Sequence, residues 1–351
     1  MIHKAFNCIL LAKLVMLHFL AINAKVPAVI VFGDSSVDTG NNNELPTFLK
    51  SNFEPYGRDL NGGNPTGRFS NGRLPSDFIS EAFGLKPIVP AFLNPNYNIS
   101  DFATGVCFAS AGTGYDNATS DEVSVLPLWK EVEYYKQYQQ QLRLYLGEEE
   151  GMEVVEEALY LISIGTNDFL ENYYARPGGR ALEFSVPQYE NFLISIAENF
   201  ITELYYLGAR KLSLGGLPPM GCLPLERTTN AMHYRECIAV YNEVAEEFNG
   251  KLENLVDKLN MELKGLRLVF SNPYDLLLEM IQKPSSFGFD YADIACCATG
   301  LVEMGYMCDK LNPFTCADAE KYVFWDAFHP TEKTNNLISA HLVKNYLTKF
   351  L

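Results

Sequence analysis

The chain has 351 residues, of which 48% are hydrophobic and 20% are charged, and its formal net charge is −16. This composition excludes a disordered or fibrous protein. A strongly negative field repels phosphate backbones and anionic headgroups, so the charge disfavours nucleic acid and anionic membrane surfaces as partners.

The first 24 residues form a segment that differs from the rest of the chain. It carries Lys4 and Lys13 but no acidic residue, and a mostly apolar run near its end leads to Ala24. This pattern predicts a secretory signal peptide that is cleaved after Ala24. A membrane anchor and a buried first helix are the alternatives, but the apolar run is far shorter than the ~20 residues that span a bilayer. We therefore expect residues 25–351 to form a single secreted, extracellular domain with no integral membrane association.

Short apolar runs alternate with longer amphipathic stretches along the rest of the chain. The apolar runs that predict strands are Pro27–Phe32, Gly105–Phe108, Ala158–Ile164, Lys211–Leu214 and Leu266–Phe270. The stretches that predict helices are Ser76–Phe83, Leu126–Leu146, Pro187–Leu207, His233–Leu263, Pro273–Ile281 and Thr331–Leu347. Near-continuous apolar strands are typical of a parallel sheet buried on both faces. The alternation therefore predicts an α/β protein, a three-layer α/β/α sandwich around a mostly parallel five-stranded sheet.

A long segment from Gly40 to Gly72 interrupts this alternation. It is rich in Asn, Gly and Pro and contains no periodic apolar pattern. Loops of this length are either functional or ordered by packing on the domain.

Seven of the eight cysteines remain once Cys8 is removed with the leader. Secretion favours disulfides over metal binding for them. Cys222 and Cys237 are spaced to close one loop. We expect two more bridges among Cys296, Cys297, Cys308 and Cys316, in a pairing that the sequence leaves open. A zinc site formed by these four cysteines is the alternative. Cys107 is then the unpaired thiol, because it lies inside an apolar strand.

Two glycosylation sequons satisfy the requirement that no proline follows the asparagine. They begin at Asn98 and Asn117, in stretches rich in turn residues. In a secreted chain both are candidates for N-glycosylation.

Candidate catalytic groups lie at the two ends of the domain. Ser35 follows the first apolar run in a Gly-Asp-Ser triplet, and the carboxyl edge of an open parallel sheet is where ligands bind. His329 lies just before the last helix, three residues after Asp326, a spacing that lets a carboxylate approach the imidazole Nδ1 and leave Nε2 free. The alternatives are an ordinary turn at Ser35 and a helix-entry turn with a capping acid at Asp326.

Two further segments could supply hydrogen-bond donors to a reacting oxygen. Asn167 follows the third apolar run, where its amide could point toward a developing oxyanion or merely form an Asx turn. The small residues of 108–114 let backbone N–H groups approach a ligand, although they are equally suited to a tight loop. Tyr56, Phe69 and Phe328 lie near these motifs, as candidates for a pocket lining or for the core.

Taken together and in this order, the motifs resemble the GDSL, or SGNH-hydrolase, family, most closely its plant secreted esterase/lipase branch. The matching blocks extend over nearly the whole mature chain and read FGDSSVDTGNNN, PYGRD, PTGRFSNGR, FASAGTG, ISIGTND, GLPPMGCLP, CCATG and FWDAFHPTEKTN. One departure is Cys107, at a position where this branch commonly has asparagine. The resemblance implies the flavodoxin-like SGNH-hydrolase fold.

The resemblance also assigns roles to individual residues. Ser35 would be the nucleophile, His329 the general base and acid, and Asp326 the residue that orients it. The oxyanion donors would be the Ser35 N–H, the Gly112 N–H and the Asn167 side chain. Ala111 or Gly114 could take the place of Gly112, since only a backbone N–H is required.

The implied activity is hydrolysis of carboxylic esters in lipids, acylated small molecules or polymers through an acyl-serine intermediate, with no metal or organic cofactor. Lipid metabolism is the process it implies. An acyltransferase that uses the same three groups and a non-catalytic glycan- or lipid-binding protein are the competing hypotheses. The first differs only in the acceptor that attacks the acyl-enzyme. The second is disfavoured by the intact set of candidate catalytic residues.

Overall fold

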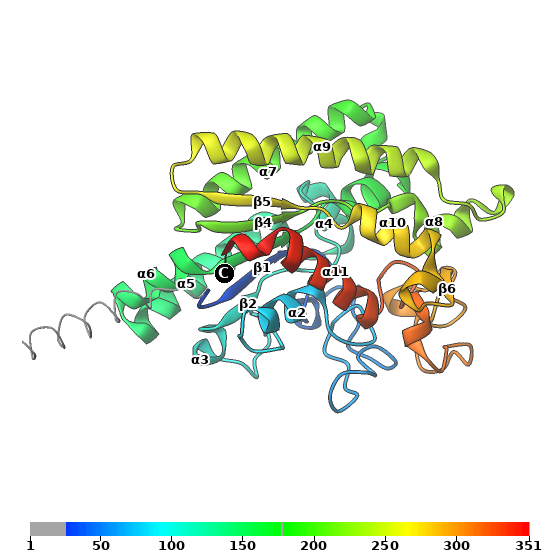
Figure 1. The fold of residues 1–351 in the computed structure, drawn as a ribbon, viewed down its shortest axis with the longest axis horizontal. Helices are drawn as coiled ribbons and strands as arrows, with labels where there is room; N and C mark the ends of the chain where they lie inside the picture. Colours follow the sequence, from blue (N-terminus) through cyan, green and yellow to red (C-terminus); the bar gives the residue numbers. More distant parts are fainter. Residues whose placement is uncertain (1–25, 177, 351) are drawn as a thin grey trace, which may run out of the picture.

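The computed structural model describes residues 26–176 and 178–350. Its centre is a sheet of five parallel strands in the order β2-β1-β3-β4-β5 (Figure 1). The strands are β1 (Val29–Gly33), β2 (Gly105–Cys107), β3 (Leu159–Ser163), β4 (Lys211–Gly215) and β5 (Arg267–Ser271). Each begins within two residues of the apolar run that predicts it. The predicted α/β fold with a five-stranded central sheet is confirmed.

The sheet is buried on both faces, as side chains along β1 show. Val29 and Val31 pack into a cluster that includes Ile79 of α2 (Pro75–Ala82) and Val343 of α11 (Glu332–Asn345). The alternate residues of β1 pack into a larger cluster with α5 (Leu128–Leu146), α7 (Val186–Tyr206) and α9 (Ala239–Glu262). Because successive side chains of a strand point to opposite faces, a continuous apolar run fills both clusters. Figure 1 shows α7 and α9 on one side of the sheet and α2 and α11 on the other, which makes the three layers.

The six predicted helices are present, with one large difference in bounds. The stretch from His233 was expected to be helical, but α9 begins only at Ala239. Tyr234 and Arg235 have φ values of 54° and 59°, which end the short 3₁₀ turn before them. Cys237 is bonded to Cys222, so the chain must first return to that residue before a new helix can begin.

Several short elements were not predicted. The additional helices are α3 (Ile99–Phe102), α4 (Asn117–Val123), α6 (Glu148–Glu157) and α8 (Pro224–Thr229), while α10 (Tyr274–Gln282) matches its prediction. A π-helix covers Asp168–Tyr174. A second, two-stranded parallel sheet pairs β6 (Tyr291–Ala295) with β7 (Tyr322–Phe324). Most of these elements are too short to show periodicity in the sequence. The exception is α6, whose 10 residues include six glutamates and only three large apolar residues, Met152, Val154 and Val155.

Three disulfides cross-link the described residues. Cys222 pairs with Cys237, as the sequence predicts. The structure decides the pairing that the sequence leaves open: Cys296 is bonded to Cys316, and Cys297 to Cys308. The zinc alternative for these four cysteines is therefore wrong. Cys107 is the buried free cysteine, as expected.

The long segment between Gly40 and Gly72 is ordered by packing. Arg68 and Asp77 form an ion pair of 2.8 Å in which both side chains are almost completely buried. The guanidinium also donates to the carbonyl oxygens of Thr39 and Val89. Removing one partner of such a pair would leave an uncompensated buried charge, so the loop is tied firmly to α2.

The predicted signal peptide lies outside the described residues. Within 26–176 and 178–350, no helix combines the length and the hydropathy needed to cross a bilayer.

Candidate active site

Ser35 lies where the chain turns out of the sheet after β1. Gly33, the last residue of β1, has φ of 138°, and a Cβ at this position would overlap the carbonyl oxygen of Ser163. Glycine is required by both constraints. The Asp34 N–H then donates to the same carbonyl at 3.0 Å. The turn thus begins in direct contact with β3 and leaves Ser35 at the carboxyl edge of the sheet.

His329 and Asp326 come from the segment between β7 and α11, and the structure brings both to Ser35. The Oγ of Ser35 lies 2.8 Å from His329 Nε2. His329 Nδ1 lies 2.8 Å from each carboxylate oxygen of Asp326. Asp326 also accepts the backbone N–H groups of Phe328 and His329. The carboxylate therefore closes a local turn in the segment before α11 and contacts the imidazole as well. It does not cap the helix, since α11 begins at Glu332 with Thr331 as its N-cap.

The candidate oxyanion donors line one cavity with Ser35. This cavity of about 250 Å³ is bordered by Ser35, Gly112, Asn167 and His329. The Asn167 amide donates to the Thr113 carbonyl at 3.0 Å, which leaves its second N–H hydrogen available. The structure thus places Gly112 and Asn167 on the wall of the cavity that contains the serine.

The structure also separates the two alternatives to Gly112. Ala111 borders the same cavity, but its N–H donates to the Asp38 carboxylate at 3.1 Å. Gly114 does not border the cavity, and a Cβ there would overlap the Asp168 carboxylate. Of the three candidates, Gly112 is therefore the one that combines position with an uncommitted N–H among the described hydrogen bonds.

Buried carboxylates hold the backbone around the serine. Asp38 accepts the N–H groups of Gly40 and Asn41 as well as that of Ala111. Burial raises the pKa of Asp38 to about 6, and it also raises the pKa of Asp34. Asp38 is bonded to backbone N–H groups, and Asp34 accepts the N–H and the hydroxyl of Ser36 rather than the hydroxyl of Ser35.

Asp168 plays the same part for the segment after β3. Its carboxylate accepts the N–H groups of Tyr115 and Asp116 and the hydroxyl of Thr119. Burial raises the pKa of Asp168 to about 7. The aspartate that follows Asn167 therefore ties the third strand's loop to the loop that carries Gly112.

A second cavity, of about 150 Å³, meets the first at Ser35 and His329. It lies over the ends of β3 and β4 and under α2, α10 and α11, and most of its lining is apolar. The apolar residues include Leu74, Ile79, Leu217, Leu277, Phe324 and Ile338. Ser35 is thus placed between an apolar chamber and a more polar one that includes Glu122 and Arg176.

From the sequence, Tyr56, Phe69 and Phe328 are candidates for a pocket lining or for the core, and the structure gives Tyr56 a different place from the other two. Phe69 and Phe328 line both cavities, whereas Tyr56 lines neither. The hydroxyl of Tyr56 instead donates to Asp326 Oδ2 at 2.6 Å. The PYG motif marks this position, but nothing in a single sequence indicates its partner, which is 270 residues away.

No group of three or more His, Cys, Asp or Glu side chains suited to a metal ion occurs within 26–176 and 178–350.

Comparison with known proteins agrees with the arrangement of the motifs. A family model described as GDSL-like Lipase/Acylhydrolase matches residues 29–342. The GDSL esterase/lipase At2g04570 of Arabidopsis thaliana is 62% identical over 327 residues, covering 93% of each chain. The GDSL esterase/lipase At4g26790 of the same plant is 63% identical with the same coverage. A solved structure titled "The active site of a carbohydrate esterase displays divergent catalytic and non-catalytic binding functions" is 13% identical, with a TM-score of 0.38, and covers 94% of this chain and 72% of the other.

Proposed function

The chain belongs to the GDSL-like lipase/acylhydrolase family, and on that premise we propose that it hydrolyses carboxylic esters at Ser35. The observation that carries the proposal is the chain of contacts from Ser35 Oγ to His329 Nε2 and from His329 Nδ1 to Asp326, each 2.8 Å long. A serine hydroxyl is a weak nucleophile until an adjacent base accepts its proton, and this geometry supplies that base.

The proposed reaction has two halves. Ser35 Oγ attacks the ester carbonyl carbon while His329 Nε2 takes the hydroxyl proton, and the carbonyl oxygen becomes an oxyanion facing the donors Gly112 and Asn167. The C–O bond to the alcohol then breaks, and His329 returns the proton to the leaving alkoxide. Water attacks the acyl-serine with His329 again as base, which releases the acid and restores the serine. Asp326 stabilises the imidazolium in both halves.

We propose that the substrate is a lipid or another ester with an aliphatic acyl group. The apolar chamber beside Ser35 supports this, because its lining offers dispersion contacts and no charged partner for a polar acyl group other than the groups at the serine itself. The more polar cavity, which contains the oxyanion donors, would then face the carbonyl oxygen and the alcohol.

A chain-length series of p-nitrophenyl esters, from acetate to palmitate, tests this proposal on the wild type and on Ser35→Ala. We expect Ser35→Ala to lower the hydrolysis rate by at least about 10³-fold. Ser195→Ala is a matched control, because Ser195 is exposed on α7 and bonds only its own helix backbone, at Phe192. Equal activity of Ser35→Ala and wild type would refute the assignment of the nucleophile.

The same assay distinguishes the acyltransferase alternative. With a polyol present, a hydrolase yields mainly free acid, whereas an acyltransferase yields the polyol ester. A folded wild type that produces neither would favour the non-catalytic binding protein.

We also propose that the chain is secreted and glycosylated. Three disulfides within the described residues support an oxidising compartment. Asn98 and Asn117 are both exposed, which supports their use as glycan acceptors. Amino-terminal sequencing of the mature protein should begin at Lys25, and removal of N-glycans should increase its electrophoretic mobility.

A further inference from the structure

Tyr56 is completely buried beside the candidate catalytic groups, although it belongs to the long loop before α2. Its ring makes edge contacts with Phe53, Phe69 and Trp325, at centroid distances of 5.6 to 6.0 Å. Phe69 in turn packs against the imidazole of His329 at 5.0 Å. The position of the phenol is thus fixed by packing on several sides.

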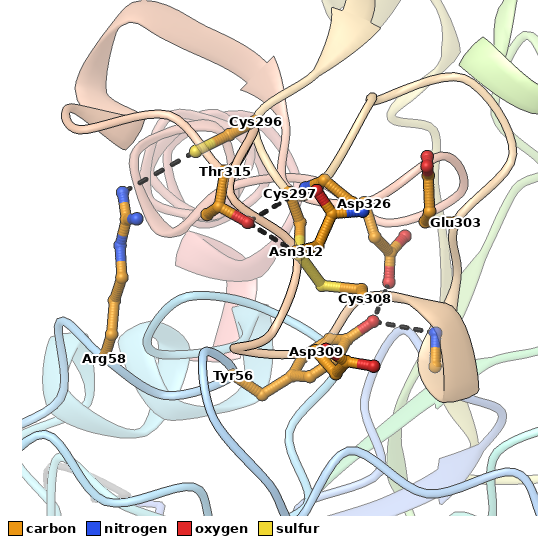
Figure 2. Close-up of a disulfide and its surroundings, with 12 residues drawn as sticks. Tyr56, Arg58, Cys296, Cys297, Glu303, Cys308, Asp309, Asn312, Thr315 and Asp326 are labelled. Atoms are coloured by element: carbon orange, nitrogen blue, oxygen red, sulfur yellow. Dashed lines mark hydrogen bonds between the residues drawn. A yellow bond between two sulfur atoms is a disulfide. The ribbon is translucent and has the colours of Figure 1, made fainter.

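The hydroxyl of Tyr56 has two hydrogen-bond partners with different roles (Figure 2). It donates to Asp326 Oδ2 at 2.6 Å, and its oxygen accepts the N–H of Gly305 at 2.8 Å. A phenol has a single hydrogen, and the Gly305 N–H can only donate. The Gly305 N–H therefore occupies the oxygen's acceptor side and directs the phenol hydrogen to the carboxylate.

The two carboxylate oxygens of Asp326 have different hydrogen-bond partners, and the Tyr56 hydroxyl is important for the position of one of them. Its Oδ1 accepts two backbone N–H groups, from Phe328 and His329, whereas Oδ2 contacts only the imidazole and the Tyr56 hydroxyl among the described hydrogen bonds. The carboxylate is fully buried, and its ion-pair partner is His329. Tyr56 is thus the donor that reaches this carboxylate from a distant part of the chain.

Gly305 is held in place by the disulfide between Cys297 and Cys308, which closes the loop that carries it. The same loop is bonded to the catalytic segment, because the Ala327 N–H donates to the Glu303 carbonyl at 2.8 Å and the Cys297 N–H to the Trp325 carbonyl at 2.7 Å. Figure 2 shows the disulfide beside Tyr56 and Asp326.

We propose that Tyr56 is a positioning residue for the ester hydrolysis proposed above. Its hydroxyl, directed by the Gly305 N–H of the disulfide-closed loop, holds the Asp326 carboxylate so that His329 Nε2 faces Ser35. Burial and the neighbouring Asp326 charge raise the pKa of Tyr56 well above its ordinary value, so the phenol keeps the hydrogen that it donates.

The test is Tyr56→Phe, which removes only the hydroxyl. We expect kcat/KM for a short ester to fall about 10- to 100-fold, as for the loss of a hydrogen bond to a buried charged group, with kcat carrying most of the loss. The loss of kcat comes from the carboxylate and imidazole no longer being held in line with Ser35. Because the carboxylate also has one donor fewer to share its charge with, it favours the imidazolium, so the acid limb of the pH profile should shift to higher pH. Asp34, an acid whose charge also interacts with His329, is unchanged in this variant.

Tyr138→Phe is the matched control, because its hydroxyl is equally buried but donates to the Phe102 carbonyl at 3.4 Å, away from the site. We expect its pH profile to match that of the wild type. In an Asp326→Ala background, Tyr56→Phe should have little further effect, since the acceptor of the Tyr56 hydrogen is already absent. An unshifted profile, or a loss of activity that adds to that of Asp326→Ala, would reduce Tyr56 to a packing residue and overturn the proposal.

Two further measurements test the positions of Gly305 and His329 without relying on Tyr56→Phe activity alone. Cys297→Ser combined with Cys308→Ser releases the loop that carries Gly305 without altering Tyr56, and it should shift the acid limb in the same direction. The Nδ1 proton signal of His329, followed by NMR without substrate, should change its chemical shift in Tyr56→Phe, because the carboxylate that it contacts has lost a donor. This second readout needs no activity, so it separates failure of the Tyr56 proposal from failure of the proposed hydrolysis.

Discussion

The acidic side chains around Ser35 differ in function, and their hydrogen-bond partners show the difference. Asp34, Asp38 and Asp168 accept backbone or hydroxyl hydrogens and fix loops, whereas Asp326 contacts the imidazole. The same residue type therefore serves structure at three positions and the proposed chemistry at one. Asn167 differs again, because its amide is only partly committed.

At the residue scale, Asn167→Ala should reduce turnover without unfolding the protein. Loss of one oxyanion donor typically lowers kcat by about 10² to 10³-fold, or about 2.7–4 kcal/mol. Stability should fall by only about 1 kcal/mol, because the side chain's described hydrogen bond is the one to Thr113. The measurements are kcat on a short ester and the denaturation midpoint.

Asn260→Ala is a suitable control for this variant. Its amide bonds both backbone groups of Leu268 at the start of β5, far along the sheet from Ser35. We expect Asn260→Ala to lose stability but to retain turnover. If Asn167→Ala turned over substrate as fast as this control, the role of Asn167 as an oxyanion donor would be wrong.

At the scale of elements, the junction before α9 shows how a covalent link overrides local preference. Cys222 and Cys237 are joined across a separation of 15 residues. The Ile238 N–H donates to the Gly221 carbonyl at 2.9 Å, and the Gly221 N–H donates to the Asn242 side chain at 2.8 Å. The disulfide and these bonds seat the first turn of α9 on the loop that follows β4.

Replacing both cysteines of this bridge by serine should lower the free energy of unfolding by about 3 kcal/mol, the value expected for closing a loop of about 15 residues. Denaturant unfolding under oxidising conditions measures this change. The free thiol of Cys107 is present in both proteins and so cancels in the comparison. An unchanged unfolding midpoint would mean that the contacts of Gly221 are sufficient without the bond.

At the scale of the whole molecule, several buried acids have raised pKa values, which link the stability of the fold to pH. Burial raises the pKa of Asp38 to about 6 and that of Asp168 to about 7, and it raises the pKa of Glu131 as well. In the unfolded chain such groups titrate near about 4. Between these values the folded state binds protons that the unfolded state does not, so its stability falls as the pH rises. The net charge of −16 adds self-repulsion in the same range.

We therefore expect the thermal unfolding midpoint to be higher near pH 5 than near pH 8. Calorimetry across this range measures the slope, and Asp168→Asn should flatten it, because one of the titrating groups is removed. A midpoint that rises steadily from pH 5 to pH 8 would show that groups with lowered pKa values dominate instead.

The sequence predicted the layers of this fold because their signal is local. An apolar run such as Pro27–Phe32 has to be buried on both faces, and the alternation with amphipathic stretches requires helices on each side. Short elements such as β6 and β7 escaped prediction, because a few residues carry no measurable period. The start of α9 was misplaced because a long-range bridge decided it.

The sequence by itself also determined which residues were candidates for the site, since Ser35, Asp326, His329 and Asn167 stand in blocks with recognisable order. Only the tertiary structure decided which of three neighbouring residues borders the serine's cavity with an uncommitted N–H, how four cysteines pair, and that Tyr56 bonds Asp326. Each of these depends on the direction of a side chain or a backbone N–H relative to residues far along the chain. Composition and spacing carry no information about such directions, because packing fixes them only once the whole chain has folded.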